Sequence, residues 1–230
     1  MKPRLLFACL LLFAARSAAE AGWIPLFDGG SLEHWQPAEN PQTFRVENSV
    51  LVIHGPRAHL FYAGPVEDAE FHHFELRADV LTQPGANSGL YFHTHYQPSG
   101  WPRHGYEVQI NNSHSDWRRT GSLYGINDVR DSPARDDEWF ELRVRVMDRR
   151  IQIWVADTLM VDYLEPENVR RAPRYAGRRL SRGTIALQGH DPKSEVRIRR
   201  LEIRPLPDAT QTSARAKPAP SSPRGVRARR

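Results

Sequence analysis

Cysteine is almost absent from this sequence of 230 residues. The single one, Cys9, lies in an apolar run close to the first residue. A chain with one cysteine forms no intrachain disulfide, and beyond residue 9 it offers neither a thiol nucleophile nor a cysteine metal ligand. The folded part is therefore expected to depend on its apolar core for stability, which a domain of this size is able to supply.

Helical periodicity is also missing, because no segment of useful length repeats apolar residues every three to four positions. The apolar run at residues 5–15 is too short to span a bilayer as a permanent helix. It follows Lys2 and Arg4 and precedes Ala19-Glu20-Ala21, a small-x-small cleavage pattern. Residues 1–21 are thus predicted to be a secretory signal peptide rather than a structural helix. We expect a periplasmic or secreted protein with no stable membrane insertion after cleavage near Ala21.

Positive charge is scarce in the middle of the chain, although the whole sequence carries +5. Residues 1–21 contribute +2 and residues 207–230 contribute +5, so residues 22–206 carry −2. A nucleic-acid-binding domain is expected to carry its basic charge on the folded part, so no nucleic-acid partner is expected. Residues 207–230 consist largely of Pro, Ser, Ala and Arg and are predicted to be a disordered basic tail.

What residues 22–206 do contain is apolar and polar residues in alternation, the pattern of half-buried strands. More than ten such segments, separated by turn sequences, indicate one all-β domain built as a two-sheet antiparallel jelly-roll sandwich. The expected strands are an opening strand within 22–35, then 43–46, 50–54, 60–62, 71–81, 90–95, 106–110, 122–126, 139–147, 150–156, 159–163, 184–188 and 196–203.

The strands expected at 90–95 and 106–110 share an unusual polar face. In the first, apolar side chains alternate with Tyr91, His93 and His95, and in the second with Glu107 and Gln109. Because side chains of a strand alternate between its two faces, neighbouring strands would bring these five together on one side of a sheet. Such a face is best explained as the floor of a site.

The strand expected at 184–188 adds Gln188 on the same parity, followed by His190 and Asp191. Aromatic residues, among them Trp101 and Tyr124, lie in the segments nearby. Rings combined with amide and carboxylate groups suit sugars, which stack their C–H faces on rings and need paired donors and acceptors. Structural alternatives exist, since Trp101 could cap the sandwich edge, Tyr124 could be core and each histidine could be structural.

This polar face could belong to two kinds of catalytic site, a metal site or the two-carboxylate site of a glycosidase. His93 and His95 have a spacing that some metal sites use, and Glu107 or His190 would complete a set of nitrogen and oxygen ligands. No third ligand at a fixed spacing accompanies the pair, so a divalent metal stays possible and no cofactor is predicted. An ordinary glycosidase needs two carboxylates flanking the bond, and this face offers Glu107 alone. The acidic residues 136–138 read better as a solvated turn, so two-carboxylate hydrolysis is not expected.

A set of motifs runs in order along nearly the whole of residues 22–206: GWIPLFDGGSLEHW at 22–35, NSGLYFHT at 87–94, GYEVQINN at 105–112, TGSLYGI at 120–126, DDEW at 136–139 and GTIALQGHD at 183–191. Together they resemble the 3-keto-disaccharide hydrolase domain family, formerly a domain of unknown function. One departure lies at residues 155–158, where family members usually have an Asn-Gly turn. It concerns a hairpin tip and leaves the site unaffected.

The resemblance implies a concanavalin A-like lectin/glucanase fold and cleavage of glycosides oxidised at C3 of the sugar. The C3 ketone acidifies the C2 hydrogen, so a base removes it, the enolate expels the C1 substituent, and water adds to the enone. This chemistry needs one base, donors for the enolate oxygen and an acid for the leaving group. Glu107 is expected as base or metal ligand, with His93, His95 or His190 as acid and oxyanion partners. The expected carbohydrate contacts are Tyr91, His95, Trp101, Arg103, Gln109, Tyr124, Gln188 and Asp191.

A second function from another class stays open, a non-catalytic lectin-like module that binds sugar in the same groove. Such a module would keep the aromatic residues and could lose Glu107 and the histidines. Because this chain retains them, the sequence favours an exported enzyme.

Overall fold

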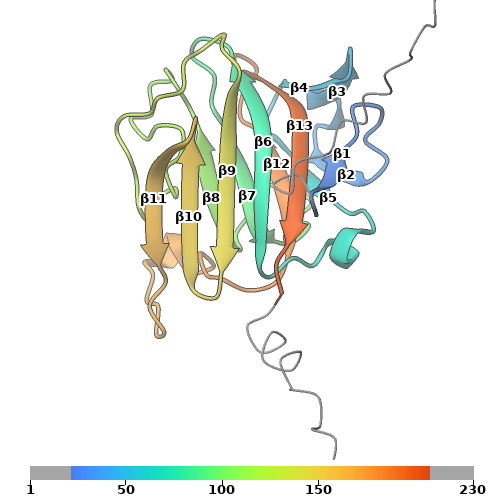
Figure 1. Cartoon of the computed structure of the whole chain (residues 1–230). Coiled ribbons are helices and arrows are strands. Elements are labelled where there is room, and N and C mark those ends of the chain that lie inside the picture. The colour runs from blue at the N-terminus through green and yellow to red at the C-terminus, as the bar shows by residue number, and fades with distance from the viewer. Residues whose placement is uncertain (1–21, 208–230) are drawn as a thin grey trace, which may run out of the picture.

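A computed structural model describes residues 22–207 (Figure 1). The predicted signal peptide and residues 208–230 of the predicted tail lie outside the described residues. The helices of the described part are short 3₁₀ turns at Pro41–Thr43, Val66–Ala69 and Pro173–Tyr175. None of these is long and apolar enough to cross a membrane.

The chain folds into two antiparallel sheets that pack face to face, as Figure 1 shows with β9, β6 and β13 in front of β7, β8 and β12. The larger sheet has the order β11-β10-β9-β6-β13-β4-β3, with β1 paired to β13, and the smaller has the order β2-β5-β12-β7-β8. The predicted all-β sandwich is therefore confirmed. The strands are β1 Ile24–Phe27, β2 Trp35–Glu39, β3 Phe44–Glu47, β4 Val50–His54, β5 Ala58–Tyr62, β6 Phe74–Thr82, β7 Ser88–Thr94, β8 Tyr106–Ile110, β9 Phe140–Met147, β10 Arg150–Val155, β11 Thr158–Leu164, β12 Thr184–Gly189 and β13 Glu195–Pro205.

The core is formed by every second side chain of the strands, because side chains alternate between the two faces of a sheet. In β6 and β9 every second side chain is buried, and the apolar ones pack against the inner face of the smaller sheet. The β9–β10 hairpin turns at residues 148–149, with Met147 paired to Arg150, and Asp148 takes a positive φ of 52°. Asp tolerates the left-handed region that such a tight turn requires, so the alternation of both strands stays in register.

The smaller sheet is buried on both faces along β5, β12, β7 and β8, which sets it apart from the larger one. Its inner face is apolar and belongs to the core. Its outer face carries polar and aromatic side chains from β5, β12, β7 and β8, and is covered by three loops at residues 95–105, 111–130 and 165–183. A polar sheet face that is not open to solvent requires partners, and this face forms the floor of the site described below.

A β-bulge interrupts β7 and corrects the prediction that His93 and His95 share a face with Tyr91. The pairing of β12 with β7 shifts register between Thr184 and Ala186, and His93 has a φ of 54°. The extra residue turns the His93 ring to the core side, where it lies 5.8 Å from the Phe74 ring of the opposite sheet. The alternation of β7 side chains between the two faces of the sheet therefore breaks at residue 93.

A second correction concerns residues 122–126, which were expected to form a strand. They form a turn instead, held by isolated bridges of Leu123 to Val108 and to Asn127. The segment pairs with β8 at one residue only, so it closes the edge of the smaller sheet without extending it.

Candidate active site

A cavity of about 730 Å³ opens on the outer face of the smaller sheet. Its floor comes from β7, β8 and β12, and its walls come from the three covering loops. The lining residues are Asn87, Tyr91, Trp101, Pro102, Arg103, His104, Glu107, Gln109, Asp116, Tyr124, Pro173, Arg174, Tyr175, Ala176, Gly177, Arg178, Gln188 and His190.

Glu107 lies at the centre of the floor and is 5 % exposed. The Gln188 side-chain amide donates to its Oε1 at 3.0 Å and to the Tyr91 hydroxyl at 2.8 Å, and the Tyr91 hydroxyl in turn bonds to the carboxylate. Gly89 on the neighbouring strand makes room for it, because a Cβ there would lie 2.6 Å from Glu107 Oε1. Burial raises the pKa of Glu107, while the charge of Arg178 opposes the rise.

Arg178 is a buried residue of the cavity that sequence reasoning missed. It comes from the irregular segment between β11 and β12, where no periodic pattern says which side chain points inward. Its Nη2 lies 3.4 Å from Glu107 Oε2, its guanidinium lies 5.4 Å from the Tyr91 ring centre, and it is buried. The floor therefore holds a carboxylate and a guanidinium that are both removed from water, an arrangement that strengthens their interaction.

The segment that carries Arg178 is anchored in the core by Tyr106. The Tyr106 ring packs in the core, while its hydroxyl donates to the Glu165 carboxylate and accepts from Arg171 at 2.7 Å. Glu165 also accepts the Leu180 backbone N–H at 3.2 Å, and Arg171 Nε donates to the Arg178 carbonyl at 3.0 Å. These bonds fix both ends of the wall segment and so fix the position of Arg178.

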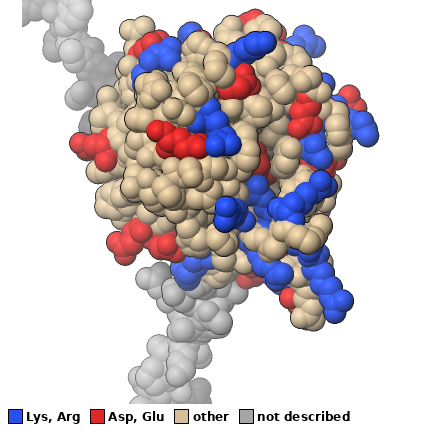
Figure 2. All heavy atoms as spheres, turned by 180° about the vertical axis from the view of Figure 1, so that it is seen from behind, with Lys and Arg blue, Asp and Glu red and all other residues tan. Residues whose placement is uncertain are grey.

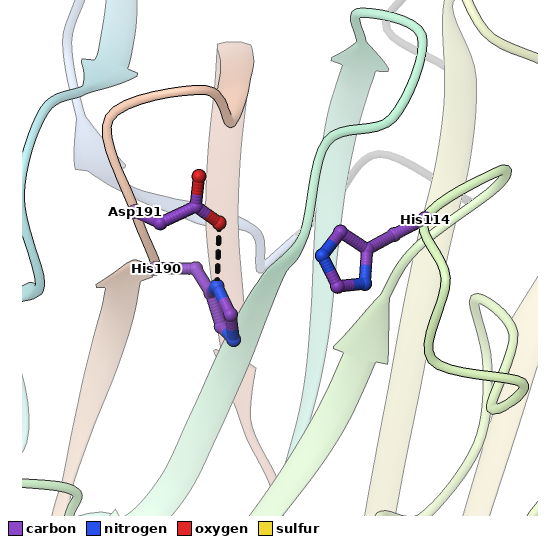
Figure 3. Close-up of side chains that lie close together, drawn as sticks. All are labelled: His114, His190 and Asp191. Carbon is purple, nitrogen blue, oxygen red and sulfur yellow. Dashed lines mark hydrogen bonds and ion pairs between the residues drawn. The ribbon is translucent and has the colours of Figure 1, made fainter.

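His190 and Asp191 form a pair at one side of the cavity (Figure 3). His190 Nδ1 donates to Asp191 Oδ2 at 2.7 Å, and Asp191 also accepts from the Ser194 hydroxyl and the Lys193 backbone N–H, both at 2.8 Å. These bonds, which outweigh its partial burial, lower the pKa of Asp191 to about 2. A carboxylate on Nδ1 orients the imidazole and leaves Nε2 as the nitrogen available for proton transfer.

One group of side chains in the described part of the chain has metal-like spacing, and it consists of His114, His190 and Asp191, whose ligand atoms lie within 4.8 Å of one another. His114 Nδ1, however, accepts the Asp116 backbone N–H at 3.0 Å. The neutral ring therefore carries its proton on Nε2, and neither nitrogen has a free lone pair for a metal. His190 Nδ1 and Asp191 are engaged with each other, which leaves His190 Nε2 as the single free ligand atom of the three residues, too few for a metal centre as they stand. His93, His95 and Glu107 do not form such a group.

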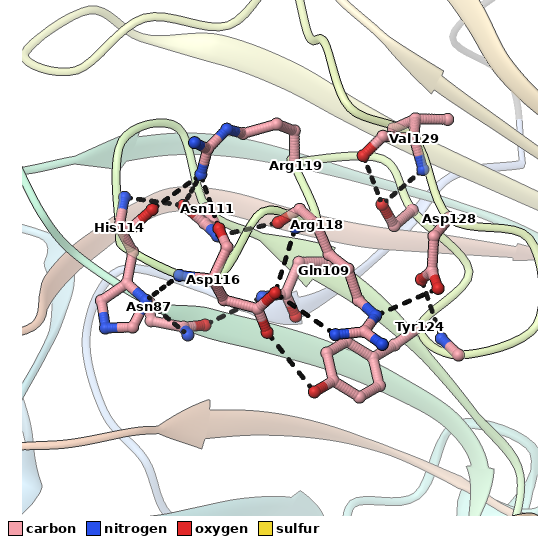
Figure 4. A network of polar contacts seen from close by, with 12 residues as sticks. Asn87, Gln109, Asn111, His114, Asp116, Arg118, Arg119, Tyr124, Asp128 and Val129 are labelled. Atoms are coloured by element: carbon pink, nitrogen blue, oxygen red, sulfur yellow. Dashed lines mark hydrogen bonds and ion pairs between the residues drawn. The ribbon is translucent and has the colours of Figure 1, made fainter.

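The loop at residues 111–130 forms a wall that is held by its own polar side chains (Figure 4). Asn111 Nδ2 donates to the Asp116 and Arg118 carbonyls at 2.8 and 2.7 Å, and Arg118 Nε donates to Asp128 at 3.0 Å. Tyr124 reaches the cavity from this loop, with its hydroxyl 3.4 Å from Asp116 Oδ2. Tyr124 therefore lines the cavity and is not part of the core cluster.

Trp101 forms the opposite corner of the cavity. Its ring lies 5.4 Å from the His190 ring, 5.6 Å from the His59 ring and 5.4 Å from the Arg57 guanidinium. His59 is buried beneath it, and burial lowers the pKa of His59 to about 4. An apolar ring face beside polar groups provides the surface on which a sugar stacks.

The floor also has unused hydrogen-bonding capacity. Within residues 22–207, the buried side-chain oxygens of Gln109 and Gln188 accept no hydrogen bond, and His59 Nε2 has no partner. Buried polar atoms without partners cost free energy unless a ligand or water satisfies them. The two glutamines belong to the cavity lining, whereas His59 lies beneath it, so the glutamine carbonyls are the acceptors that match the donors of a polyhydroxylated ligand.

The structure brings together most of the residues that the sequence predicted for the site. Asp191 lies directly behind His190, and His93 and His95 are left out. His95 is exposed beside a separate hollow of about 280 Å³. The predicted residues that line the cavity are Tyr91, Trp101, Arg103, Glu107, Gln109, Tyr124, Gln188 and His190.

The two stacked sheets and the polar cavity on the smaller one define a concanavalin A-like β-sandwich. The chain belongs to the 3-keto-alpha-glucoside-1,2-lyase-like domain family, whose model matches residues 22–204. No curated protein matches the chain.

Solved structures share the fold at low identity. A proposed glycosyl hydrolase from Parabacteroides distasonis ATCC 8503 is similar with a TM-score of 0.69 and 19 % identity, over 81 % of this chain and 94 % of that chain. A second one from the same organism has a TM-score of 0.61 and 22 % identity, over 80 % and 99 %. The exoplasmic/lumenal domain of VIP36, in a Ca²⁺/Man3GlcNAc-bound form, has a TM-score of 0.53 and 10 % identity, over 85 % and 93 %.

Proposed function

We propose that this protein is an exported enzyme that cleaves 3-keto-glycosides by proton abstraction at C2, elimination of the C1 substituent and hydration. Family membership supports the substrate class, and the observation that carries the mechanism is the pairing of one buried carboxylate with one carboxylate-oriented histidine in a single cavity. This set of groups suits an elimination, which needs a single base and a single acid. The other carboxylate of the lining, Asp116, is engaged with Arg118 at 3.3 Å and with the Tyr124 hydroxyl at 3.4 Å, so it is not assigned as the second catalytic carboxylate that ordinary glycoside hydrolysis requires.

Glu107 is assigned as the base that takes the C2 proton. Its raised pKa makes it a stronger base than an ordinary surface carboxylate, and Arg178 still favours the ionised form that accepts the proton. When the proton leaves C2, negative charge develops on the C3 oxygen. Arg178 and the Tyr91 hydroxyl are the donors beside Glu107 that would stabilise this enolate.

His190 is assigned as the acid that protonates the departing C1 oxygen. Asp191 stabilises the imidazolium, and Nε2 is left to deliver the proton. In the second half of the reaction the roles reverse: His190 takes a proton from water as the oxygen adds to C1, and Glu107 returns the proton to C2. The net result is hydrolysis, with both groups restored to their starting protonation states.

The test is to incubate the purified protein with a 3-keto-glucoside and to measure the release of the aglycone. Glu107→Gln is expected to lower the rate by about 10²-fold or more, the scale expected for a positioned base. Glu33→Gln, an exposed glutamate outside the cavity, is the matched control and is expected to retain the wild-type rate. A Glu107→Gln rate within a few-fold of wild type would remove Glu107 from the mechanism.

A non-catalytic lectin-like module is the second candidate function, and the unused acceptors of Gln109 and Gln188 favour it equally well. The VIP36 domain, which has a related fold, is a sugar-bound form. Tight glycoside binding without any turnover of the 3-keto-glucoside would support the module and exclude the enzyme.

A further inference from the structure

The acidic residues of the cavity are already matched by positive partners. Glu107 is paired with Arg178, and Asp116 Oδ1 lies 3.3 Å from Arg118 Nη1. These contacts leave no carboxylate of the lining free to attract a cation.

Two arginines of the lining have no such match. Arg103 and Arg174 are exposed at the cavity mouth, and neither has an ion pair with any residue of the described range 22–207. The guanidinium of Arg174 lies 4.7 Å from the Tyr175 ring centre, which holds it beside the cavity. Both therefore present unneutralised positive charge to whatever enters.

The two arginines belong to loops that touch each other. The Gly105 backbone N–H donates to the Gly177 carbonyl at 3.0 Å, and a Cβ at Gly177 would lie 2.0 Å from the Arg103 carbonyl oxygen. This contact holds the 95–105 loop and the 165–183 segment together at the same side of the mouth. Both charges are thus placed on one side by a close backbone approach.

The charge at this mouth differs from that of the domain. Residues 22–206 carry a net charge of −2. Figure 2, which views the molecule from behind, nevertheless shows Lys and Arg side chains gathered around a hollow. A local positive field at the rim of a cavity attracts anionic ligands and fixes their orientation.

We propose that the glycoside taken by this cavity carries an anionic group, a carboxylate or a sulfate, on its leaving group, and that Arg103 and Arg174 bind that group at the mouth. The inference rests on the proposed function for the orientation: the reacting sugar lies against Glu107 on the floor, so the C1 substituent extends toward the mouth. Planar guanidinium groups bind carboxylate and sulfate oxygens in pairs, which a neutral aglycone does not offer.

The experiment compares binding of unoxidised glucosides by calorimetry, so that turnover does not interfere. The ligands are phenyl, 4-carboxyphenyl and 4-sulfooxyphenyl glucoside, each as both anomers. The anionic ligands are expected to bind about tenfold more tightly than the phenyl glucoside, and the advantage is expected to shrink between 0.05 and 0.5 M salt because solvent-exposed charges are screened. Comparison of the 4-carboxyphenyl and 4-sulfooxyphenyl glucosides shows which anion is preferred.

Two variants assign the effect to the named residues. The double variant Arg103→Gln/Arg174→Gln is expected to lose the anion preference, so that it binds the 4-carboxyphenyl and 4-sulfooxyphenyl glucosides no more tightly than the phenyl glucoside. Arg170→Gln, which removes an exposed arginine of the same segment outside the cavity lining, is expected to keep the preference. Equal binding of neutral and anionic glucosides, no binding of either, or a preference that survives in the double variant would overturn the inference. Absence of turnover with the preference intact would count against the proposed function alone.

Discussion

The protonation state of His93 makes acid stability a sharp test of the structure. His93 is buried, its Nε2 donates to the His72 carbonyl at 2.8 Å, and its Nδ1 accepts the Ser181 backbone N–H at 3.2 Å. Both nitrogens are satisfied only in the neutral ring, because a proton on Nδ1 would face the Ser181 N–H. Burial lowers the pKa of His93 from 6.5 to about 4.

The magnitude follows from this shift and from the similar one at His59, whose pKa burial also lowers from 6.5 to about 4. The unfolded chain takes up these protons first, so the stability contribution is fully present above about pH 6.5 and is lost as the pH falls toward 4. Each histidine then removes about 2 kcal/mol from the free energy of unfolding between pH 7 and pH 5. Together they remove about 4 kcal/mol, a large part of the 5–15 kcal/mol typical of a domain.

The assay is urea unfolding at pH values from 7 to 5, with the free energy of unfolding plotted against pH. His93→Gln is expected to reduce the slope of this plot by about half, whatever its effect on absolute stability. It removes one of the two histidines that take up a proton when the chain unfolds. His34→Gln, which replaces an exposed histidine, is the control and is expected to leave the slope as in wild type. A wild-type slope in His93→Gln would refute the neutral, doubly bonded ring.

Three further predictions concern the site. Gly89→Ala is expected to lower kcat/KM at least tenfold, because the new Cβ would displace the Glu107 carboxylate; overpacking of this kind also costs about 1–3 kcal/mol, measurable by urea unfolding. Arg178→Met is expected to shift the acid limb of the plot of kcat/KM against pH upward by about 1–3 pH units, because loss of the guanidinium raises the pKa of Glu107. An acid limb that does not move would mean that Glu107 is not the base. His95→Gln is expected to retain activity within about twofold, since the exposed ring lies outside the cavity lining; the rate with a 3-keto-glucoside checks this.

Strand alternation was enough to predict the sandwich and most of the cavity floor. Tyr91, Glu107, Gln109 and Gln188 were predicted on the working face because period-two parity holds wherever a strand is regular. His93 failed because one bulged residue reverses parity, and bulge positions leave little trace in a single sequence.

The walls were harder to predict than the floor. Arg178 could not be chosen from the arginines of 165–183, because no repeating geometry relates an irregular segment to the sheet. Its inward position follows from the bond of Arg171 to the Arg178 carbonyl, and Arg171 is in turn held by Tyr106, which is distant in the sequence. The expected strand at 122–126 shows the same limit, since its apolar residues serve a turn that packs on β8.

The different anchoring of the two walls has a consequence for how new specificities could arise. The 111–130 wall closes its polar bonds largely within itself, through Asn111, Arg118 and Asp128, and enters the core through Leu123, so another loop is expected to fit in its place if it keeps an apolar side chain at that position. The 165–183 wall is fastened to Tyr106, whose ring is part of the core, so replacing it would also require repacking the sandwich. Diversification of substrate range in this scaffold is therefore expected to proceed through the first wall, while the arginine-bearing wall changes by point substitution.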